Sequence, residues 1–220
     1  MVVHKAPPTA DPDPQPTTSG RRAESGGVRL PAAERRRQLL HVARTVFAAR
    51  GFYETTMADI ADAAGVTKPV LYQHFDSKRD LYTAVLRDTG VQLRTAVISA
   101  AANGEGPRQQ VAAGFEAYVT FVETDADGFN LLFSSTSRQD DEWAEITAEV
   151  EESIAAGIAE LIDVPEISPA HRSALAHGIL GQAEGMMRYW QSDSSSDLDR
   201  NDLLANLVSL TWGGLRGLNG

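Results

Sequence analysis

The side chains with the clearest potential for chemistry are Lys68, Gln73 and His74, which lie on one short amphipathic stretch. The apolar side chains among them face inward at helical spacing, so the ammonium, amide and imidazole groups are left outside. An exposed helix face of this kind can donate hydrogen bonds to the base edges and phosphates of a DNA groove. The inward-facing residues are Val70, Leu71 and Phe75.

The neighbouring residues predict how this polar face is held. Thr56 lies where a helix N-cap is expected, and Gly65 is suited to the left-handed conformation that ends the first helix. Thr67 can cap a second helix, whose first turn contains Pro69, where a missing N–H does no harm. Two short helices joined by a tight turn form a helix-turn-helix, whose second helix can enter the DNA major groove.

This stretch resembles the N-terminal domain of the TetR family of bacterial repressors. The resemblance covers about residues 35–87, and beyond it only the helical layout and the total length agree. Pro69 departs from the small residue that the family usually carries there. The matching features, in order, are Thr55-Thr56, Ile60-Ala61, Ala64-Gly65-Val66, Leu71-Tyr72, His74-Phe75, Ser77-Lys78 and Leu81.

The resemblance implies a set of DNA contacts. Thr56 would present its hydroxyl and backbone N–H groups to a phosphate, although it could serve only as a cap. Residues that open the second helix would reach bases or backbone, and later positions match residues that touch phosphates in the family. Tyr72 could instead belong partly to the core. The implied contacts are Thr56, Thr67, Lys68, Tyr72, His74 and Lys78.

The charge of the chain is divided unevenly along its length. The net charge is −10, yet residues 29–80 hold nine Lys and Arg against six Asp and Glu, a balance of +3. Residues 1–28 are neutral, and the remainder holds eight basic against 21 acidic residues. A basic head on an acidic body is the asymmetry expected of a DNA-reading module joined to a domain that does not bind DNA.

Composition and spacing argue against several classes of protein. The chain has no cysteine, which excludes disulfides and cysteine-based zinc sites. It lacks a run of about 18 apolar residues and an apolar signal segment, so we expect a cytoplasmic protein without a membrane partner. His171 and His177 would project in different directions from one helix, and no histidine lies at ligand spacing from the acidic residues near 140–145. We therefore expect no metal, no cofactor and no catalytic residues.

The pattern along the chain predicts three parts and an all-α fold. Residues 1–28 are rich in Pro, Ser, Thr, Asp and Gly and are expected to form a disordered tail; Arg21 and Arg22 there could touch DNA or simply be solvated. Residues 29–80 form the helix-turn-helix domain of three helices, and residues 81–220 a larger helical domain for ligand binding and dimerisation. A helix from Lys78 to about Ala102 joins the two, with Gly90 as an expected bend.

The last two helices carry glycine at helical spacing. Gly178, Gly181 and Gly185 make one side of a helix nearly bare, which suggests close approach of another helix or a ligand. The final helix has Gly213, Gly214 and Gly217. The TetR resemblance implies that these two helices pair with their copies in a four-helix homodimer interface.

Large apolar side chains in the second domain could line a pocket or simply form its core. If these side chains face helices that carry glycine in place of larger residues, space remains between them for a small, mostly apolar effector. The candidate ligand-binding residues are Phe115, Tyr118, Phe121, Phe129, Phe133, Trp143, His177, Met186, Met187 and Trp190.

Together these features predict a homodimeric DNA-binding transcription regulator. We expect it to repress by occupying a near-palindromic double-stranded operator, from which the effector releases it. The alternative is a helical ligand-binding or interaction protein that does not depend on DNA.

Overall fold

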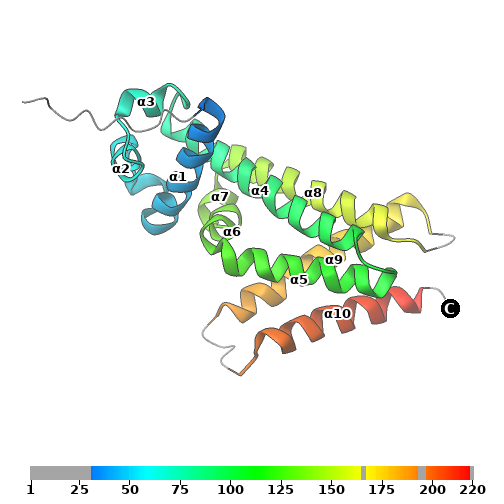
Figure 1. The fold of residues 1–220 in the computed structure, drawn as a ribbon. Helices are drawn as coiled ribbons and strands as arrows, with labels where there is room; N and C mark the ends of the chain where they lie inside the picture. Colours follow the sequence, from blue (N-terminus) through cyan, green and yellow to red (C-terminus); the bar gives the residue numbers. More distant parts are fainter. Residues whose placement is uncertain (1–30, 165–166, 193–196, 219–220) are drawn as a thin grey trace, which may run out of the picture. The chain divides into compact units, whose positions relative to one another are not determined.

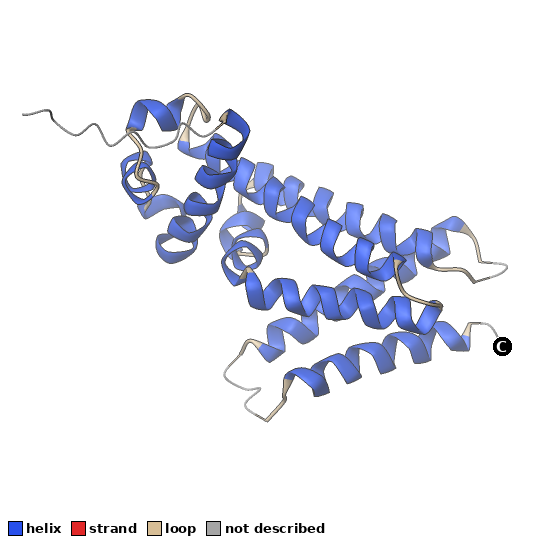
Figure 2. Cartoon of the chain, viewed as in Figure 1, coloured by secondary structure: helices blue, strands red, loops and turns tan. Residues whose placement is uncertain are grey.

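The computed structural model of the chain describes residues 31–164, 167–192 and 197–218, which form α-helices and no strand (Figures 1 and 2). The all-α fold is thereby confirmed, whereas the tail expected at residues 1–28 lies outside the described ranges. No helix in these ranges is both long and apolar enough to cross a membrane. The helices are α1 (Ala32–Glu54), α2 (Met57–Ala63), α3 (Lys68–Tyr72), α4 (Lys78–Ala102), α5 (Pro107–Thr124), α6 (Ala126–Leu132), α7 (Ser135–Gln139), α8 (Asp141–Leu161), α9 (Pro169–Trp190) and α10 (Arg200–Gly217).

The first three helices bury apolar side chains in a core that continues into the larger helices; α1 contributes Leu39 and Phe47, α2 Ile60 and α3 Leu71, all fully buried. The helical conformation of α1 is interrupted at Gly51. Gly51 has φ 77°, a left-handed conformation that favours glycine. Beyond Gly51 one further turn runs to Glu54.

The helix-turn-helix follows the local rules read from the sequence. Thr56 caps α2, since its hydroxyl accepts a hydrogen bond from the backbone N–H of Asp59, while the Asp59 carboxylate accepts from the backbone N–H of Thr56. Gly65 takes φ 64° in the turn. Pro69 lies in the first turn of α3, and Thr67 stands at its N-cap position without a side-chain capping bond.

Helix α4 connects the helix-turn-helix to the remaining helices. It runs unbroken from Lys78 to Ala102, so the bend expected at Gly90 is replaced by a close crossing. A Cβ atom built on Gly90 would lie 2.3 Å from a methyl carbon of Val150 in α8. The missing side chain therefore lets α4 and α8 approach closely.

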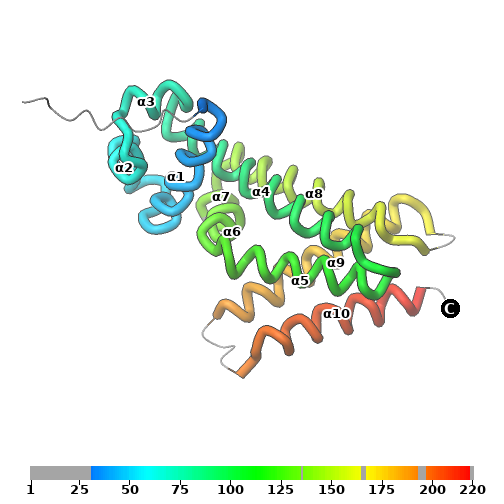
Figure 3. The backbone as a smooth tube through the Cα atoms, in the orientation of Figure 1, coloured from blue at the N-terminus to red at the C-terminus, as the bar shows by residue number. Residues whose placement is uncertain are grey.

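The larger helices pack along one another, as the tube view shows (Figure 3). Helix α4 contacts both α5 and α8, α9 contacts α8, and α10 contacts α5 and α9. Their shared core includes Leu93, Phe115, Val119 and Leu180. The five-residue helix α7, with the sequence STSRQ, is not predicted by the sequence pattern, because it contains no apolar residue that could mark a buried face.

Candidate nucleic-acid interface and apolar cavity

The opening of α3 carries the most accessible of the predicted DNA-contacting side chains. Thr67 and Lys68 are exposed, and neither side chain makes a hydrogen bond or ion pair within the described part of the chain. Tyr72, near the end of α3, is 50% exposed, so its hydroxyl can reach a partner outside the chain. These three groups form one accessible donor set at the second helix of the helix-turn-helix.

Two further predicted contacts are partly engaged within the protein. The exposed Thr56 hydroxyl donates to a carboxylate oxygen of Asp59 at 2.6 Å, and these bonds from Thr56 lower the pKa of Asp59. His74 is half-buried, with its ring 6.4 Å from that of Phe75, and its carbonyl accepts from Arg36 at 3.3 Å. DNA contact by Thr56 and His74 stays a prediction.

Lys78 holds the end of α1 rather than reaching freely into solvent. Its ammonium donates to the carbonyl oxygens of Phe52 at 2.7 Å, Thr55 at 2.8 Å and Tyr53 at 3.3 Å. The same ammonium lies 4.4 Å from the centre of the Phe52 ring. An ammonium has three N–H donors, and all three are used here. Phosphate contact by Lys78 stays a prediction. In the structure, the Lys78 side chain stabilises the end of α1.

Of the three consecutive arginines near the start of α1, two contact other residues and, within the described part of the chain, one is free to contact DNA. Arg35 bonds to Gln38 at 2.6 Å, and Arg36 lies 4.3 Å over the Phe75 ring. Arg37 is exposed and has no partner among the described residues. Arg37 is therefore the member of this run most available to a phosphate.

A buried arginine, not predicted from the sequence, ties the first helix to two others. Arg44 is 6% exposed in α1; its guanidinium bonds to Asp88 of α4 at 2.9 Å and to Asp125, the N-cap residue of α6. The sequence does indicate the burial of Arg44, because this residue follows Leu40 by four positions and precedes Phe47 by three. That spacing places it on the buried face of α1.

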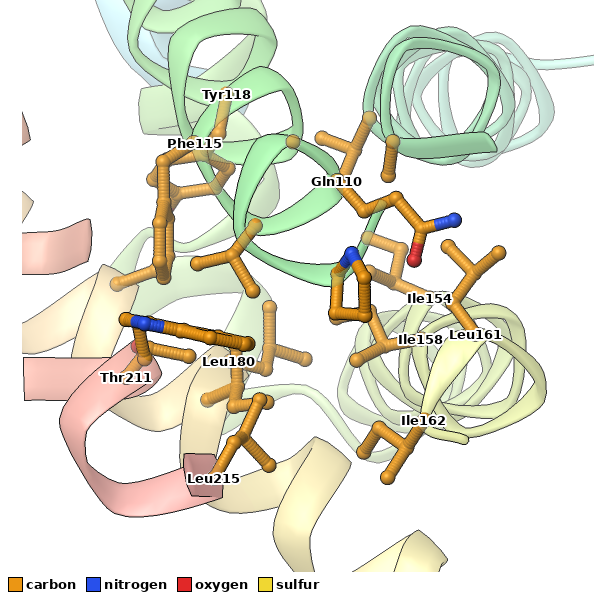
Figure 4. Close-up of a pocket in the computed structure, with 18 of the residues that line it drawn as sticks. Gln110, Phe115, Tyr118, Ile154, Ile158, Leu161, Ile162, Leu180, Thr211 and Leu215 are labelled. Atoms are coloured by element: carbon orange, nitrogen blue, oxygen red, sulfur yellow. The ribbon is translucent and has the colours of Figure 1, made fainter. Parts of the chain in front are cut away.

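An apolar cavity of about 130 Å³ lies among α4, α5, α8, α9 and α10 (Figure 4). Most of its lining is aliphatic, with polar groups only at a few points, such as Gln110, Asp163 and Thr211. Drug-sized ligands occupy pockets of roughly 300–1,000 Å³. A larger ligand would therefore require the surrounding helices to move apart. The lining residues include Val97, Val111, Phe115, Tyr118, Ile154, Ile158, Leu161, Leu180, Trp212 and Leu215.

Of the ten residues predicted to bind a ligand, Phe115 and Tyr118 line this cavity. Phe129 and Phe133 line a second, more polar cavity of about 280 Å³ with Glu184 and Arg188. The other six line neither, so the structure does not bring the set together. Sequence reasoning chose aromatic and methionine residues, whereas the walls are mainly isoleucine, leucine and valine.

The six remaining candidates lie elsewhere. Trp143, Phe121 and Met187 are buried in the core, and Met186 packs against it half-buried. His177 is exposed, with its ring 3.1 Å from a Glu152 carboxylate oxygen, and the indole N–H of Trp190 donates to the carbonyl of Leu198. Ligand contact by these six stays a prediction.

Tyr118, one of the residues that line the apolar cavity, carries an unpaired polar group. Its hydroxyl oxygen is buried and has no hydrogen-bond partner. Burial, and then the charge of Glu184, raise the pKa of the Tyr118 phenol. Burial also raises the pKa of Glu184, with Glu151 adding to the effect. Because an unpaired buried hydroxyl is costly, a ligand group that accepts its hydrogen bond would be favoured there.

The arrangement contains few features of an enzyme or metal site. No group of three or more His, Asp or Glu side chains in the described ranges is arranged to hold a metal ion. The helix-turn-helix offers hydrogen bonding and charge, and the cavity offers mainly apolar contact.

Comparisons with known proteins agree with this arrangement. A family model described as "Bacterial regulatory proteins, tetR family" matches residues 39–85. The chain is 36% identical, over 86% of its length and 86% of the relative's, to the HTH-type transcriptional activator FasR of Mycolicibacterium smegmatis. It is 53% identical to the HTH-type transcriptional repressor KstR2 of Rhodococcus jostii, over 24% of this chain and 26% of that protein.

The fold is also similar to solved structures. A TetR-like transcriptional regulator from Rhodococcus sp. RHA1 aligns with a TM-score of 0.66 and 29% identity. That alignment covers 86% of this chain and all of the other.

Proposed function

Because this chain belongs to the TetR family of bacterial regulatory proteins, we propose that it binds operator DNA as a homodimer whose affinity a small apolar effector controls. The chain is a DNA-binding transcription regulator, and its relatives are regulators rather than enzymes. We assign DNA binding to residues 29–80, and effector binding and dimerisation to residues 81–220.

The observation that carries the DNA-binding role is the accessible donor set at α3. Thr67, Lys68 and Tyr72 are exposed on the second helix of a helix-turn-helix, in a segment with a net charge of +3. A positive segment of this kind adds phosphate attraction to base reading. A gel-shift assay with the DNA upstream of the protein's own gene tests it, and absence of a shift at low salt would favour the DNA-independent alternative.

The homodimer is supported by the open glycine faces of α9 and α10. A Cβ built on Gly178, Gly181 or Gly185 would meet nothing within 4 Å in this chain, and the same holds for the three glycines of α10. Leu210 lies beside them on α10 and is 62% exposed. Helices without side chains on one face can approach a partner closely, so these faces suit pairing with a second copy.

The effector is supported by the apolar cavity and the unpaired hydroxyl of Tyr118. The matching ligand is a mostly apolar molecule with one hydrogen-bond acceptor. A thermal-shift screen of such molecules would find ligands that raise the melting temperature, since binding to the native state stabilises it. Each ligand is then titrated with and without operator DNA. Unequal affinities support effector control, and equal affinities contradict it for that ligand.

We propose repression as the effect of operator binding, with activation as a second candidate. A stretch of 53 residues matches the repressor KstR2, but a relative that aligns over 86% of the chain is named an activator. Deleting the gene and measuring transcription from the bound promoter separates the two. Transcription rises after loss of a repressor and falls after loss of an activator.

A further inference from the structure

Arg79 joins the start of α4 to the start of α8. Its guanidinium bonds to both carboxylate oxygens of Asp140, at 2.6 and 3.0 Å, and to Glu142 at 2.7 Å. Asp140 is the N-cap residue of α8, and Glu142 lies in its first turn. A two-pronged contact of this kind fixes direction as well as distance. We call Arg79, Asp140 and Glu142 the α4–α8 clamp.

Beneath the clamp lies Trp143, the aromatic centre of the junction. Its ring is 4.5 Å from the Arg79 guanidinium carbon, and its indole N–H donates to the Thr83 hydroxyl at 3.1 Å. Trp143 is fully buried and packs 4.7 Å from Phe52 of α1 and 4.5 Å from Tyr82 of α4. The beginning of α8 therefore touches a helix of the DNA-binding segment directly.

The far part of the same helix forms one wall of the apolar cavity. Ile154, Ile158 and Leu161 point into that cavity from α8 (Figure 4). From Trp143 to Ile158 the helix covers roughly 22 Å at 1.5 Å per residue. Between the two ends, Val150 packs where Gly90 leaves space in α4. One continuous helix thus contacts the cavity and the junction with α1.

We propose that α8 transmits occupancy of the cavity to the DNA-binding segment, and that Arg79 and Asp140 are positioning residues for DNA binding. This proposal rests on the proposed effector cavity. The sequence predicts that α4 joins the two parts; α8 lies wholly in the larger part, but its first turn contacts α1 through Trp143 and Phe52. A group that pushes the wall formed by Ile158 outward must move α8, and the clamp passes that displacement to the start of α4.

The solvent exposure of the clamp residues allows a positioning role to be tested without unfolding the protein. The side chains of Arg79 and Glu142 are 45% and 48% exposed and that of Asp140 is 22% exposed, so these are surface ion pairs, which add only a small amount to global stability. Breaking the clamp should leave the fold intact while loosening the direction in which α8 and α4 meet. Asp140→Asn is the better probe, because Arg79 is basic and could itself touch a phosphate, whereas Asp140 could not.

The test uses Ile158→Phe as a stand-in for a ligand, because the larger side chain fills the cavity from α8. Four full-length proteins are compared: wild type, Ile158→Phe, Asp140→Asn and the double variant. The DNA probe is a duplex recovered from a random-sequence library by the wild-type protein, and affinity is measured by fluorescence anisotropy. Hydrogen exchange of residues 32–77 is measured without DNA. Asp141→Asn is the matched control, since this exposed neighbour lies outside the clamp.

We expect Ile158→Phe to change DNA affinity at least about fivefold, the lower range of measured couplings between sites. With Asp140→Asn present the change should fall below about twofold, while Asp141→Asn leaves it intact. Hydrogen exchange in residues 32–77 should follow the same pattern. Should Ile158→Phe fail to fold, Leu161→Phe fills the same cavity and carries the same expectation.

Two results would overturn the proposal: equal effects of Ile158→Phe with and without the clamp, or no effect of Ile158→Phe on either readout. Failure of the wild type to select or bind any duplex would instead count against the proposed function, and hydrogen exchange would still decide whether α8 is coupled. If Arg79→Gln weakens binding and Asp140→Asn does not, Arg79 contacts DNA and has no positioning role.

Discussion

At the scale of single residues, two lysines near the recognition helix have opposite surroundings. Lys68 is exposed and unpaired within the described chain, whereas the ammonium of Lys78 donates to three carbonyls at the end of α1. Lys68→Ala should therefore weaken binding to all sequences alike and reduce the salt dependence by roughly 0.9 log unit per tenfold change in salt, without lowering the melting temperature. Anisotropy titrations at several salt concentrations measure this slope.

Lys78→Ala should lower stability before any effect on DNA is considered. It leaves the carbonyls of Phe52, Tyr53 and Thr55 without their donor, which should cost roughly 1–2 kcal/mol. Urea denaturation without DNA measures the loss, with Lys68→Ala as the control. An unchanged free energy of unfolding would show that the three hydrogen bonds do not stabilise the fold. Contact with DNA would then be the only role proposed for Lys78.

The carboxyl of Asp140 makes stability depend on acid pH. Its hydrogen bonds from Arg79 lower its pKa below the ordinary value of 3.8. A lowered folded-state pKa contributes stability that is present above 3.8 and is lost as pH falls through the folded-state pKa. Asp140→Asn should therefore flatten the stability curve below about pH 4, as measured by urea denaturation. An identical acid limb in wild type and variant would contradict the pairing.

The buried hydroxyl of Tyr118 predicts a substitution with opposite effects on stability and ligand affinity. Tyr118→Phe removes an unpaired polar atom, so the ligand-free protein should be unchanged or more stable by about 1 kcal/mol. A ligand whose acceptor uses that hydroxyl should bind more weakly to the variant. Thermal melts with and without a screened ligand test both parts. Equal ligand-induced shifts in the two proteins would mean that the hydroxyl makes no ligand contact.

At the scale of elements, the crossing of α4 and α8 depends on the absence of a side chain at Gly90. A Cβ there would lie 2.3 Å from Val150, so Gly90→Val should overpack the crossing and cost about 1–3 kcal/mol. Val150→Ala in the same chain should restore part of the loss by making room. Denaturant unfolding of the two single variants and the double variant measures this. Simple additivity of the two losses would contradict close contact at this point.

The glycines of α9 and α10 differ from Gly90, because no other side chain among the described residues packs over them. They face open space within the chain, so their use depends on what covers them. In α4, glycine serves packing inside the chain; in the last two helices, we propose that it serves packing between chains. Glycine inside a helix therefore has two different roles in this chain.

At the scale of the whole molecule, the proposed homodimer predicts the effect of Gly181→Leu. The added side chain would project from the open face of α9 into the partner and weaken dimerisation, although nothing in the single chain opposes it. Light scattering at micromolar concentration measures the dimer. Ala156→Leu, on the exposed side of α8, is the matched control. A monomeric wild type, or a fully dimeric Gly181→Leu, would rule out this interface.

The sequence by itself determined the features that depend on neighbours within a few residues. The cap formed by Thr56 and Asp59, the left-handed Gly65 and the position of Pro69 in the first turn of α3 are all local, so their residue types and spacing were enough to predict the helix-turn-helix. Apolar periodicity likewise predicted the long helices and the all-α fold, because one buried face repeats every few residues. Family membership followed from the same local motifs.

Only the tertiary structure decided which side chains meet across the chain. Lys78 bonds to carbonyls more than twenty residues away, Arg79 reaches Asp140 across 61 residues, and Arg44 reaches Asp125 across 81. The residue types show that these side chains are charged or polar, but they do not show which partners the side chains bind in the fold. The composition of the cavity wall, which is mainly aliphatic with a few aromatic rings, was not predicted for the same reason. Large rings such as Trp143 fill space, while the void remains where aliphatic side chains from five helices converge.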